Sequence, residues 1–214
     1  MAKAVIFDFN GTLFFDNDKH IRAWSAISEL LRGIPITDEE LYTQINGKRN
    51  EQIIERYKPN LSIEENKKYS LLKEEYYRKY CKADIENFHL VQGAETFFDT
   101  LKEEKIPFTI ASASIWENIE FFIQSFHLDH WIPMEWIVYD DGSYANKKMM
   151  FLEAAKRMKV NIQDTIIVED SIEGIQNAYA AGCRNIWVMD SSNQEAYLKT
   201  FPGVVKIIHN FTQV

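Results

Sequence analysis

The chain has 214 residues, which is large for one domain and small for two, so we expect one core domain that carries a large insertion. Its formal net charge is −8 and no block of Lys or Arg stands out, which argues against nucleic acid as the main partner. A small anion can still bind where a few cationic side chains form a local pocket. No apolar run is long enough to span a bilayer, and the first residues are typical of a strand rather than of a cleavable leader, so we expect a cytoplasmic protein without a membrane partner. We also expect a monomer.

The first predicted element is a short buried strand that opens into a polar loop. Residues 2–7 are apolar and partly β-branched, and the polar stretch 8–12 follows directly. We therefore expect functional side chains where this strand ends.

The pattern becomes helical from residue 16 to about residue 83. Apolar residues recur at helical spacing and are followed by a glycine that is typical of a helix end: Ile21, Trp24, Ile27, Leu31 and then Gly33. Two more helices begin with capping boxes, in which a hydroxyl and a carboxylate bind each other's unpaired backbone amides: Thr37 with Glu40, and Ser62 with Glu65. The sequence therefore predicts an all-helical insertion.

Helices and strands alternate after Gly93. We expect helices at 94–104 and 116–126, and strands at 108–111, 136–139, 165–168 and 185–188, with helices between the later strands. This alternation predicts a parallel sheet covered on both faces, that is, a doubly wound α/β core. We place the core at residues 1–14 and 85–214 and a helical cap at residues 15–84.

Polar residues at the predicted strand ends are the candidates for function, because open parallel sheets bind ligands beyond the carboxyl ends of their strands. After the first strand, Asp8 can act as a nucleophile, Gly11 permits a tight turn, and Thr12 offers a hydroxyl and an amide to an anion. Ser112 ends a second strand, with Ser114 just beyond it.

Two further places complete the set. Lys147 or its neighbour Lys148 precedes a helix and could neutralise phosphate charge. Glu169 and Asp170 end the strand 165–168, and paired acids there suggest a cation site with oxygen ligands, which suits magnesium. Each residue taken alone is also explained as a turn residue, a helix cap or solvated surface.

The set in this order resembles the four sequence motifs of the haloacid dehalogenase superfamily, over nearly the whole chain. The residues that carry the resemblance are Asp8-x-Asn10-Gly11-Thr12-Leu13, Ser112, Lys147 and Glu169-Asp170. The helical insertion resembles the small cap of subfamily I. Residues 20–24, 111–114 and 168–171 are especially similar to β-phosphoglucomutase and its phosphatase relatives.

The resemblance implies phosphoryl transfer through an aspartyl phosphate. Asp8 would attack phosphorus, and Mg²⁺ would be held by Asp8, Asp170 and the backbone carbonyl of Asn10, with Glu169 acting directly or through water. The transferring phosphoryl group would be bound by residues of three loops: Ser112, Ala113, Lys147, Gly11 and Thr12. Lys148 remains an alternative to Lys147, because the proline-containing run common in relatives is missing after it. The expected partner is a small phosphorylated metabolite.

Asn10 is the main departure from the family pattern. Related phosphatases and mutases usually carry an aspartate there, which protonates the leaving oxygen, and an amide cannot do this. Haloalkanoate dehalogenases also lack this acid, but they need no magnesium, whereas Glu169-Asp170 resembles the metal-binding form of the motif. Phosphonoacetaldehyde hydrolases need a Schiff-base lysine in the cap, which we cannot locate.

The leading expectation is a magnesium-dependent phosphatase for a small phosphate monoester such as a sugar phosphate, with phosphomutase activity as a close variant. The alternative, motivated by Asn10, is a catalytically weakened protein that binds a phosphorylated metabolite. The cap would supply specificity. Its polar candidates are His20, otherwise a helix-surface histidine, and Lys48 and Arg49, otherwise a solvated turn after Gly47. The planar fork of Arg49 suits a phosphate or carboxylate.

Overall fold

The computed structural model describes residues 3–45 and 48–214, and of Tyr42 the backbone alone. Ala2 and Gly47, which entered the sequence analysis, lie outside the described residues. The chain divides into two compact units: Met1–Phe15 with His89–Val214, and Asp16–Phe88. We call them the core unit and the insertion.

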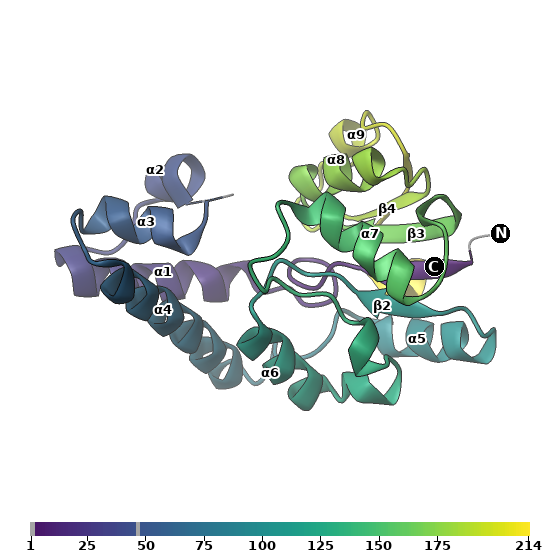
Figure 1. Ribbon diagram of the computed structural model, residues 1–214, viewed down its shortest axis with the longest axis horizontal. Helices are drawn as coiled ribbons and strands as arrows, with labels where there is room; N and C mark the ends of the chain where they lie inside the picture. Colours follow the sequence, from purple (N-terminus) through teal and green to yellow (C-terminus); the bar gives the residue numbers. More distant parts are fainter. Residues whose placement is uncertain (1–2, 46–47) are drawn as a thin grey trace. The chain divides into compact units, whose positions relative to one another are not determined.

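The core unit is built on a five-stranded sheet in which every strand pair is parallel (Figure 1). The spatial order is β2-β1-β3-β4-β5. The strands are β1 (Ala4–Phe7), β2 (Phe108–Ile110), β3 (Thr165–Glu169), β4 (Ile186–Met189) and β5 (Val204–Ile208). Phe7, the last residue of β1, pairs with Ile110 on one side and with Val168 on the other, so the carboxyl ends of these three strands lie level.

Side chains of β1 alternate between the two faces of the sheet. Ile6 belongs to a buried cluster with residues of α7 (Lys147–Arg157) and α8 (Ile172–Ala181). The opposite face of the sheet is covered by α5 (Ala94–Glu103) (Figure 1). There the ring of Phe7 packs edge-on against Phe98 of this helix. Full burial of a side chain of this size contributes roughly 1.5–3 kcal/mol. Strands buried on both faces explain the continuous apolar runs in the sequence and confirm the doubly wound fold.

Besides the strands, α5, α7 and α8, the core unit has one further long helix and several short elements. This helix, α6 (Trp116–Phe126), has the expected bounds, and α9 covers Glu195–Leu198. Single 3₁₀ turns lie at Leu128–His130, Met134–Trp136, Ile162–Asp164 and Phe211–Gln213.

The sequence-based expectations for strands fail in two places, one strand that does not form and one that was missed. Residues 136–139 form no regular strand: Pro133 begins a 3₁₀ turn, and Val138 makes one isolated bridge to Ala111. Val138 is apolar because it is buried, so the sequence around it resembles a strand, although it extends the sheet edge at this single point only. The edge strand β5 was not predicted at all, and its partly exposed residues give it no continuous apolar signal.

Every regular element among the described residues of the insertion, 16–45 and 48–88, is a helix. Its elements are α1 (Asn17–Arg32), α2 (Asp38–Glu40), a π-helical turn (Leu41–Ile45), α3 (Asn50–Tyr57) and α4 (Ile63–Ala83). Gly33 ends α1 with a φ of 79°, a left-handed conformation that glycine adopts without strain. Both predicted capping boxes are confirmed, at Thr37 and at Ser62. Among the described residues, no helix has the length and apolar character to cross a bilayer.

Candidate active site

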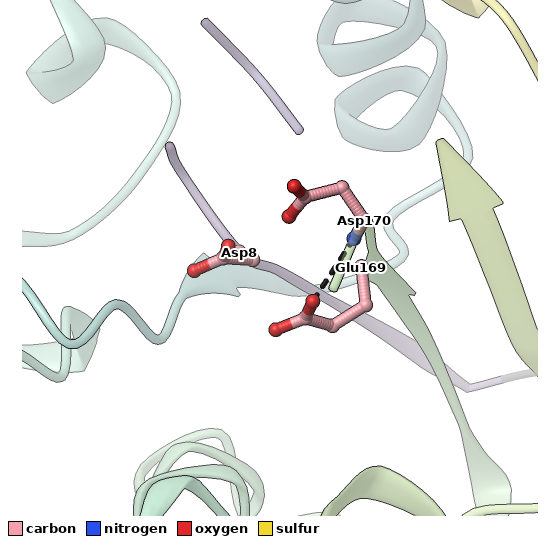
Figure 2. Close-up of side chains that lie close together, drawn as sticks. All are labelled: Asp8, Glu169 and Asp170. Carbon is pink, nitrogen blue, oxygen red and sulfur yellow. Dashed lines mark hydrogen bonds between the residues drawn. The ribbon is translucent and has the colours of Figure 1, made fainter. Parts of the chain in front are cut away.

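The strand order creates a switch point in the core unit. The chain continues from β1 to β2 on one side of it, whereas β3 lies on the other side, and ligands of open α/β sheets bind where the strand order reverses in this way. Asp8 follows β1, Glu169 is the last residue of β3, and Asp170 comes next. One oxygen of each carboxylate lies within 4.8 Å of the others (Figure 2).

Asp8 is held at the end of β1 by its backbone and by a lysine. Its N–H donates to the carbonyl oxygen of Val168 at 2.9 Å, and its Oδ1 lies 2.8 Å from Nζ of Lys147. Burial raises the pKa of Asp8 to about 7, because the charged carboxylate loses water; Lys147 opposes this rise and the negative Glu169 adds to it. A cation beside Asp8 would favour its ionised form, which is the nucleophilic one.

Glu169 is fully buried and fixed on both sides of its carboxylate. Its Oε2 accepts from the backbone N–H groups of Asp170 and Ser171, each at 2.9 Å, and from the Ser171 hydroxyl at 3.0 Å. Its Oε1 forms an ion pair with Lys147. Gly174 makes room for this group, since a Cβ at that position would lie 2.0 Å from Cδ of Glu169.

Asp170 lies against the loop that follows β1. Its Oδ1 accepts from the Thr12 hydroxyl at 3.3 Å. Gly11 has a φ of 76°, and a Cβ there would lie 2.2 Å from Oδ2 of Asp170, so both the turn and the close approach require glycine. The pKa of Asp170 is raised well above its usual range, first by burial and then by the negative charges of Glu169 and Asp8.

The charges of this cluster fit a divalent cation. Three carboxylates (Asp8, Glu169 and Asp170) meet the single ammonium of Lys147, which leaves a formal charge of about −2 when all are ionised. Crowded carboxylate oxygens are typical ligands of hard cations. The raised pKa values of Asp8 and Asp170 have the same origin, because burial and crowding of negative charge both oppose ionisation.

Lys147, and not Lys148, reaches the acidic cluster in this structure. The Lys147 ammonium contacts Asp8 and Glu169 from the first turn of α7. The backbone of Lys148 is fixed by its N–H, which donates a hydrogen bond to Oδ1 of Asn177 at 3.3 Å.

The loop after β2 brings two serines to Asn10. The hydroxyls of Ser114 and Ser112 donate to Oδ1 of Asn10 at 2.7 Å and 3.4 Å. Ser112 is buried, and its N–H donates to the carbonyl of Val138 at 3.0 Å. Ala113 is exposed in the bend between the two serines. The contact between Ser114 and Asn10 was not anticipated, because spacing along the chain does not show which side chain a strand-end loop turns inward.

The amides that were expected to meet an anion after β1 are used inside their own loop. The N–H of Gly11 donates to the carbonyl of Phe14 at 2.8 Å, and that of Thr12 donates to the carbonyl of Phe9 at 3.2 Å. The Thr12 hydroxyl donates to Asp170. In this structure Gly11 and Thr12 therefore shape the loop.

The three insertion candidates occupy two different environments. His20 of α1 packs its ring on Tyr77 at 4.1 Å, with Nε2 3.3 Å from Oδ2 of Asp16 and Nδ1 2.9 Å from Nζ of Lys73. Lys48 is exposed, and its N–H donates to the carbonyl of Ile45.

Arg49 is also exposed and stands at the start of α3. Its N–H donates to Oε1 of Gln52 at 3.2 Å, and the N–H of Gln52 donates back to the carbonyl of Arg49 at 3.0 Å. The reciprocal bonds fix the backbone of Arg49 while its side chain stays at the surface.

Sequence reasoning missed the buried polar network around His20. Lys73 is 3% exposed, and its ammonium also contacts Oε1 of Glu74 at 2.9 Å. Asn50 donates to the same oxygen at 2.8 Å. Helical periodicity does not reveal that Lys73 and Glu74 of α4 are buried, because part of their pairing comes from other helices, with His20 in α1 and Asn50 in α3.

Comparison with known proteins identifies the family. The protein-family model described as haloacid dehalogenase-like hydrolase matches residues 5–188 of this chain. The crystal structure of a HAD hydrolase of family IA, variant 3, from Entamoeba histolytica is 36% identical, has a TM-score of 0.90, and covers 99% of this chain and 95% of its own. β-Phosphoglucomutase from Clostridium difficile has the same fold, with 23% identity, a TM-score of 0.80, and coverage of 100% and 93%.

A curated relative matches over a shorter range. The bifunctional riboflavin kinase/FMN phosphatase of Arabidopsis thaliana is 32% identical over 109 residues, which are 50% of this chain and 28% of the relative. The chain thus spans little more than a quarter of this relative's length. The family match extends over most of the chain and includes Asp8, Ser112, Lys147 and Glu169-Asp170. The chain therefore belongs to the haloacid dehalogenase-like hydrolase family and is an enzyme of that family.

Proposed function

We propose that this enzyme is a magnesium-dependent phosphatase or phosphotransferase that works on a small phosphate monoester through an aspartyl phosphate on Asp8. The observation that carries the proposal is the position of Asp8: a buried carboxylate at the switch point, bound by Lys147 and facing two further carboxylates. The β-phosphoglucomutase and FMN phosphatase among the similar proteins support a phosphorylated substrate. Sugar phosphates are the first class of substrate to test.

In the first step, an Asp8 oxygen attacks phosphorus and the bond from phosphorus to the leaving oxygen breaks. Lys147 would stabilise negative charge on the phosphoryl oxygens, and Ser112 and Ala113 would bind the same group from the loop after β2. In the second step, water or an acceptor hydroxyl attacks phosphorus and releases the Asp8 carboxylate. Such a site works mainly by positioning and by neutralising charge.

The acidic cluster would hold the magnesium ion. Asp8 and Asp170 would bind it with the backbone carbonyl of Asn10, and Glu169 would act directly or through a water. When bound, Mg²⁺ neutralises charge on the phosphoryl group and thereby favours attack by an anionic nucleophile. The hydrogen bonds to Oε2 of Glu169 would keep the cluster in place while the substrate changes.

We further propose that the insertion serves as the cap that selects the substrate. Arg49 and Lys48 are exposed cations at the start of α3, and Arg49 suits an anion because its guanidinium can donate two parallel hydrogen bonds. Arg49→Ala should raise KM for the best substrate more than KM for a small aryl phosphate. Arg56→Ala, at an exposed position later in α3, is the matched control, and equal effects of Arg49→Ala on both substrates would assign Arg49 to the solvated turn.

A second candidate function follows from Asn10. Its amide carries no acidic proton, so turnover could be slow enough that the protein serves to bind a phosphorylated metabolite instead. Binding would use the same contacts as catalysis, including Lys147 and Ser112.

A phosphate-release screen over sugar phosphates, nucleotides and aryl phosphates, with and without Mg²⁺, tests the two candidates. Turnover that needs Mg²⁺ and is lost in Asp8→Asn supports the enzyme, with Asp141→Asn, in an exposed turn, as the matched control. Tight binding without turnover on any compound supports the binding protein. Turnover that survives in Asp8→Asn would overturn the assignment of the nucleophile.

A further inference from the structure

Two hydroxyl groups of the loop after β2 are turned toward the amide oxygen of Asn10. The Ser114 hydroxyl donates a hydrogen bond to Oδ1 of Asn10 at 2.7 Å, and the Ser112 hydroxyl donates one to the same atom at 3.4 Å. The loop that carries both serines is fixed, because the N–H of Asp140 donates to the carbonyl of Ser114 at 2.9 Å and the N–H of Ser112 donates to Val138. These hydroxyl protons are thus directed at Asn10, and neither serine is placed to protonate a leaving oxygen.

The ionisable groups of the cluster have other partners. The Lys147 ammonium lies between Asp8 and Glu169 and forms ion pairs with both. Asp8 is the proposed nucleophile, and Asp170 faces it as part of the acidic group. A group that must stay charged to neutralise or to attack cannot also give a proton to the leaving oxygen in the same step.

His20, the ionisable candidate of the insertion, has contacts on both ring nitrogens. Nε2 lies 3.3 Å from Oδ2 of buried Asp16, and Nδ1 lies 2.9 Å from Nζ of Lys73. The ring also stacks on Tyr77 with an interplanar angle of 13°. Both nitrogens are thus engaged within the insertion, so His20 is a poor replacement for a general acid.

We infer that the site acts on phosphates whose leaving group departs without a proton, and that acyl phosphates, the mixed anhydrides of a carboxylic and the phosphoric acid, are its preferred substrate class. The inference rests on the proposed attack by Asp8 and goes beyond the proposed monoester substrate, because an acyl phosphate is an anhydride and not an ester. A carboxylic acid has a pKa of about 4, so its anion is a stable leaving group at neutral pH, whereas an alcohol must be protonated as it leaves. Asn10 can donate a hydrogen bond to a leaving oxygen, but it cannot transfer a proton to it.

The reaction balances without a general acid in its first step. An Asp8 oxygen forms a bond to phosphorus, and the bond between phosphorus and the acyl oxygen breaks with its electron pair, which releases a carboxylate. Water then attacks the aspartyl phosphate, the bond from phosphorus to Asp8 breaks, and the proton lost by the water goes to solvent. The products are one carboxylate, one inorganic phosphate and one proton.

The test compares wild type with Asn10→Asp, which offers a carboxyl at the same place. We measure kcat/KM with Mg²⁺ on acetyl phosphate and on glycerol phosphate, an alkyl phosphate. A positioned acid raises a reaction rate by about 10²–10⁴-fold. Asn10→Asp should therefore raise kcat/KM on glycerol phosphate by a large part of this factor and raise kcat/KM on acetyl phosphate much less. Asn10→Ala, which also lacks an acid, should keep the preference of wild type.

A second measurement uses wild type alone and therefore does not depend on the folding of a variant. Over a series of substituted phenyl phosphates, the rate of phospho-enzyme formation should fall steeply as the pKa of the phenol rises. A flat dependence, or equal gains of Asn10→Asp on both donors, would overturn the inference while leaving Asp8 as the nucleophile. If no donor gives phosphate release or a phospho-enzyme in either protein, the proposed function itself fails, and the inference fails with it.

Discussion

Gly174→Ala tests whether the buried carboxylate of Glu169 depends on a missing side chain. Gly174 lies in the first turn of α8, where alanine normally stabilises a helix by about 0.5–1 kcal/mol relative to glycine. Here the new Cβ would lie 2.0 Å from Cδ of Glu169 and 2.1 Å and 2.3 Å from its two oxygens. These distances are far below van der Waals contact, so the carboxylate or the helix must move.

The cost follows from what the carboxylate holds. Moving it weakens hydrogen bonds from Asp170 and Ser171 and the ion pair with Lys147, and a hydrogen bond to a charged group contributes about 1.5–3 kcal/mol. Overpacking of a filled site adds about 1–3 kcal/mol when the neighbours cannot relax fully. After the gain in helix propensity, we expect a net loss of roughly 2–4 kcal/mol in the free energy of unfolding.

Urea denaturation of Gly174→Ala and of the control Gln176→Ala measures this loss. Gln176 lies on the exposed side of the same helix, so its replacement should change stability by no more than about 0.5 kcal/mol. The Gly174→Ala protein should also bind Mg²⁺ more weakly, since Glu169 and Lys147 would be displaced. A Gly174→Ala protein as stable as the control would refute the packing argument.

Three further outcomes are expected. Asp170→Asn should weaken Mg²⁺ binding in titration calorimetry, whereas Asp141→Asn in an exposed turn should leave it unchanged; equal affinities would remove Asp170 from the metal site. The ion pair with Arg32 lowers the pKa of Glu40 from 4.5 to about 2, so Glu40 contributes stability that is present above pH 4.5 and is lost as the pH falls toward 2. The stability difference between wild type and Glu40→Gln should therefore shrink over this interval, and a difference independent of pH would contradict it. Ser62→Ala should cost about 1 kcal/mol through loss of the cap of α4, checked by thermal melting.

The parts of the fold that follow from local chemistry were predictable from sequence. The capping box at Thr37 and the stop at Gly33 depend on residues within one helical turn, so their signals are complete in the sequence. The apolar run before Asp8 predicted a strand, because a strand buried on both faces needs apolar side chains throughout. By contrast, the strand expected at 136–139 failed because Val138 is buried in the core but forms one isolated bridge rather than a ladder of strand pairs.

The sequence indicated which residues lie near one another in the candidate site better than it indicated how their side chains are directed. Asp8 and Asp170 were expected together because parallel strands end at the same edge of the sheet. The choice of Lys147 over Lys148 depends on the direction of the first turn of α7, which the sequence alone leaves open. The need for glycine at position 174 was hidden for a similar reason, since the clash with Glu169 appears only when strand and helix are placed together.

The most direct test of the account is to find where the phosphoryl group is attached. We incubate the protein with acetyl phosphate and Mg²⁺, quench it in acid, and locate the added phosphoryl group by peptide mass spectrometry. The account predicts one phosphoryl group on Asp8, which is absent from Asp8→Asn and retained in the control Asp141→Asn. A phosphoryl group on another residue, or equal labelling of Asp8→Asn, would contradict the assignment of Asp8 as the nucleophile.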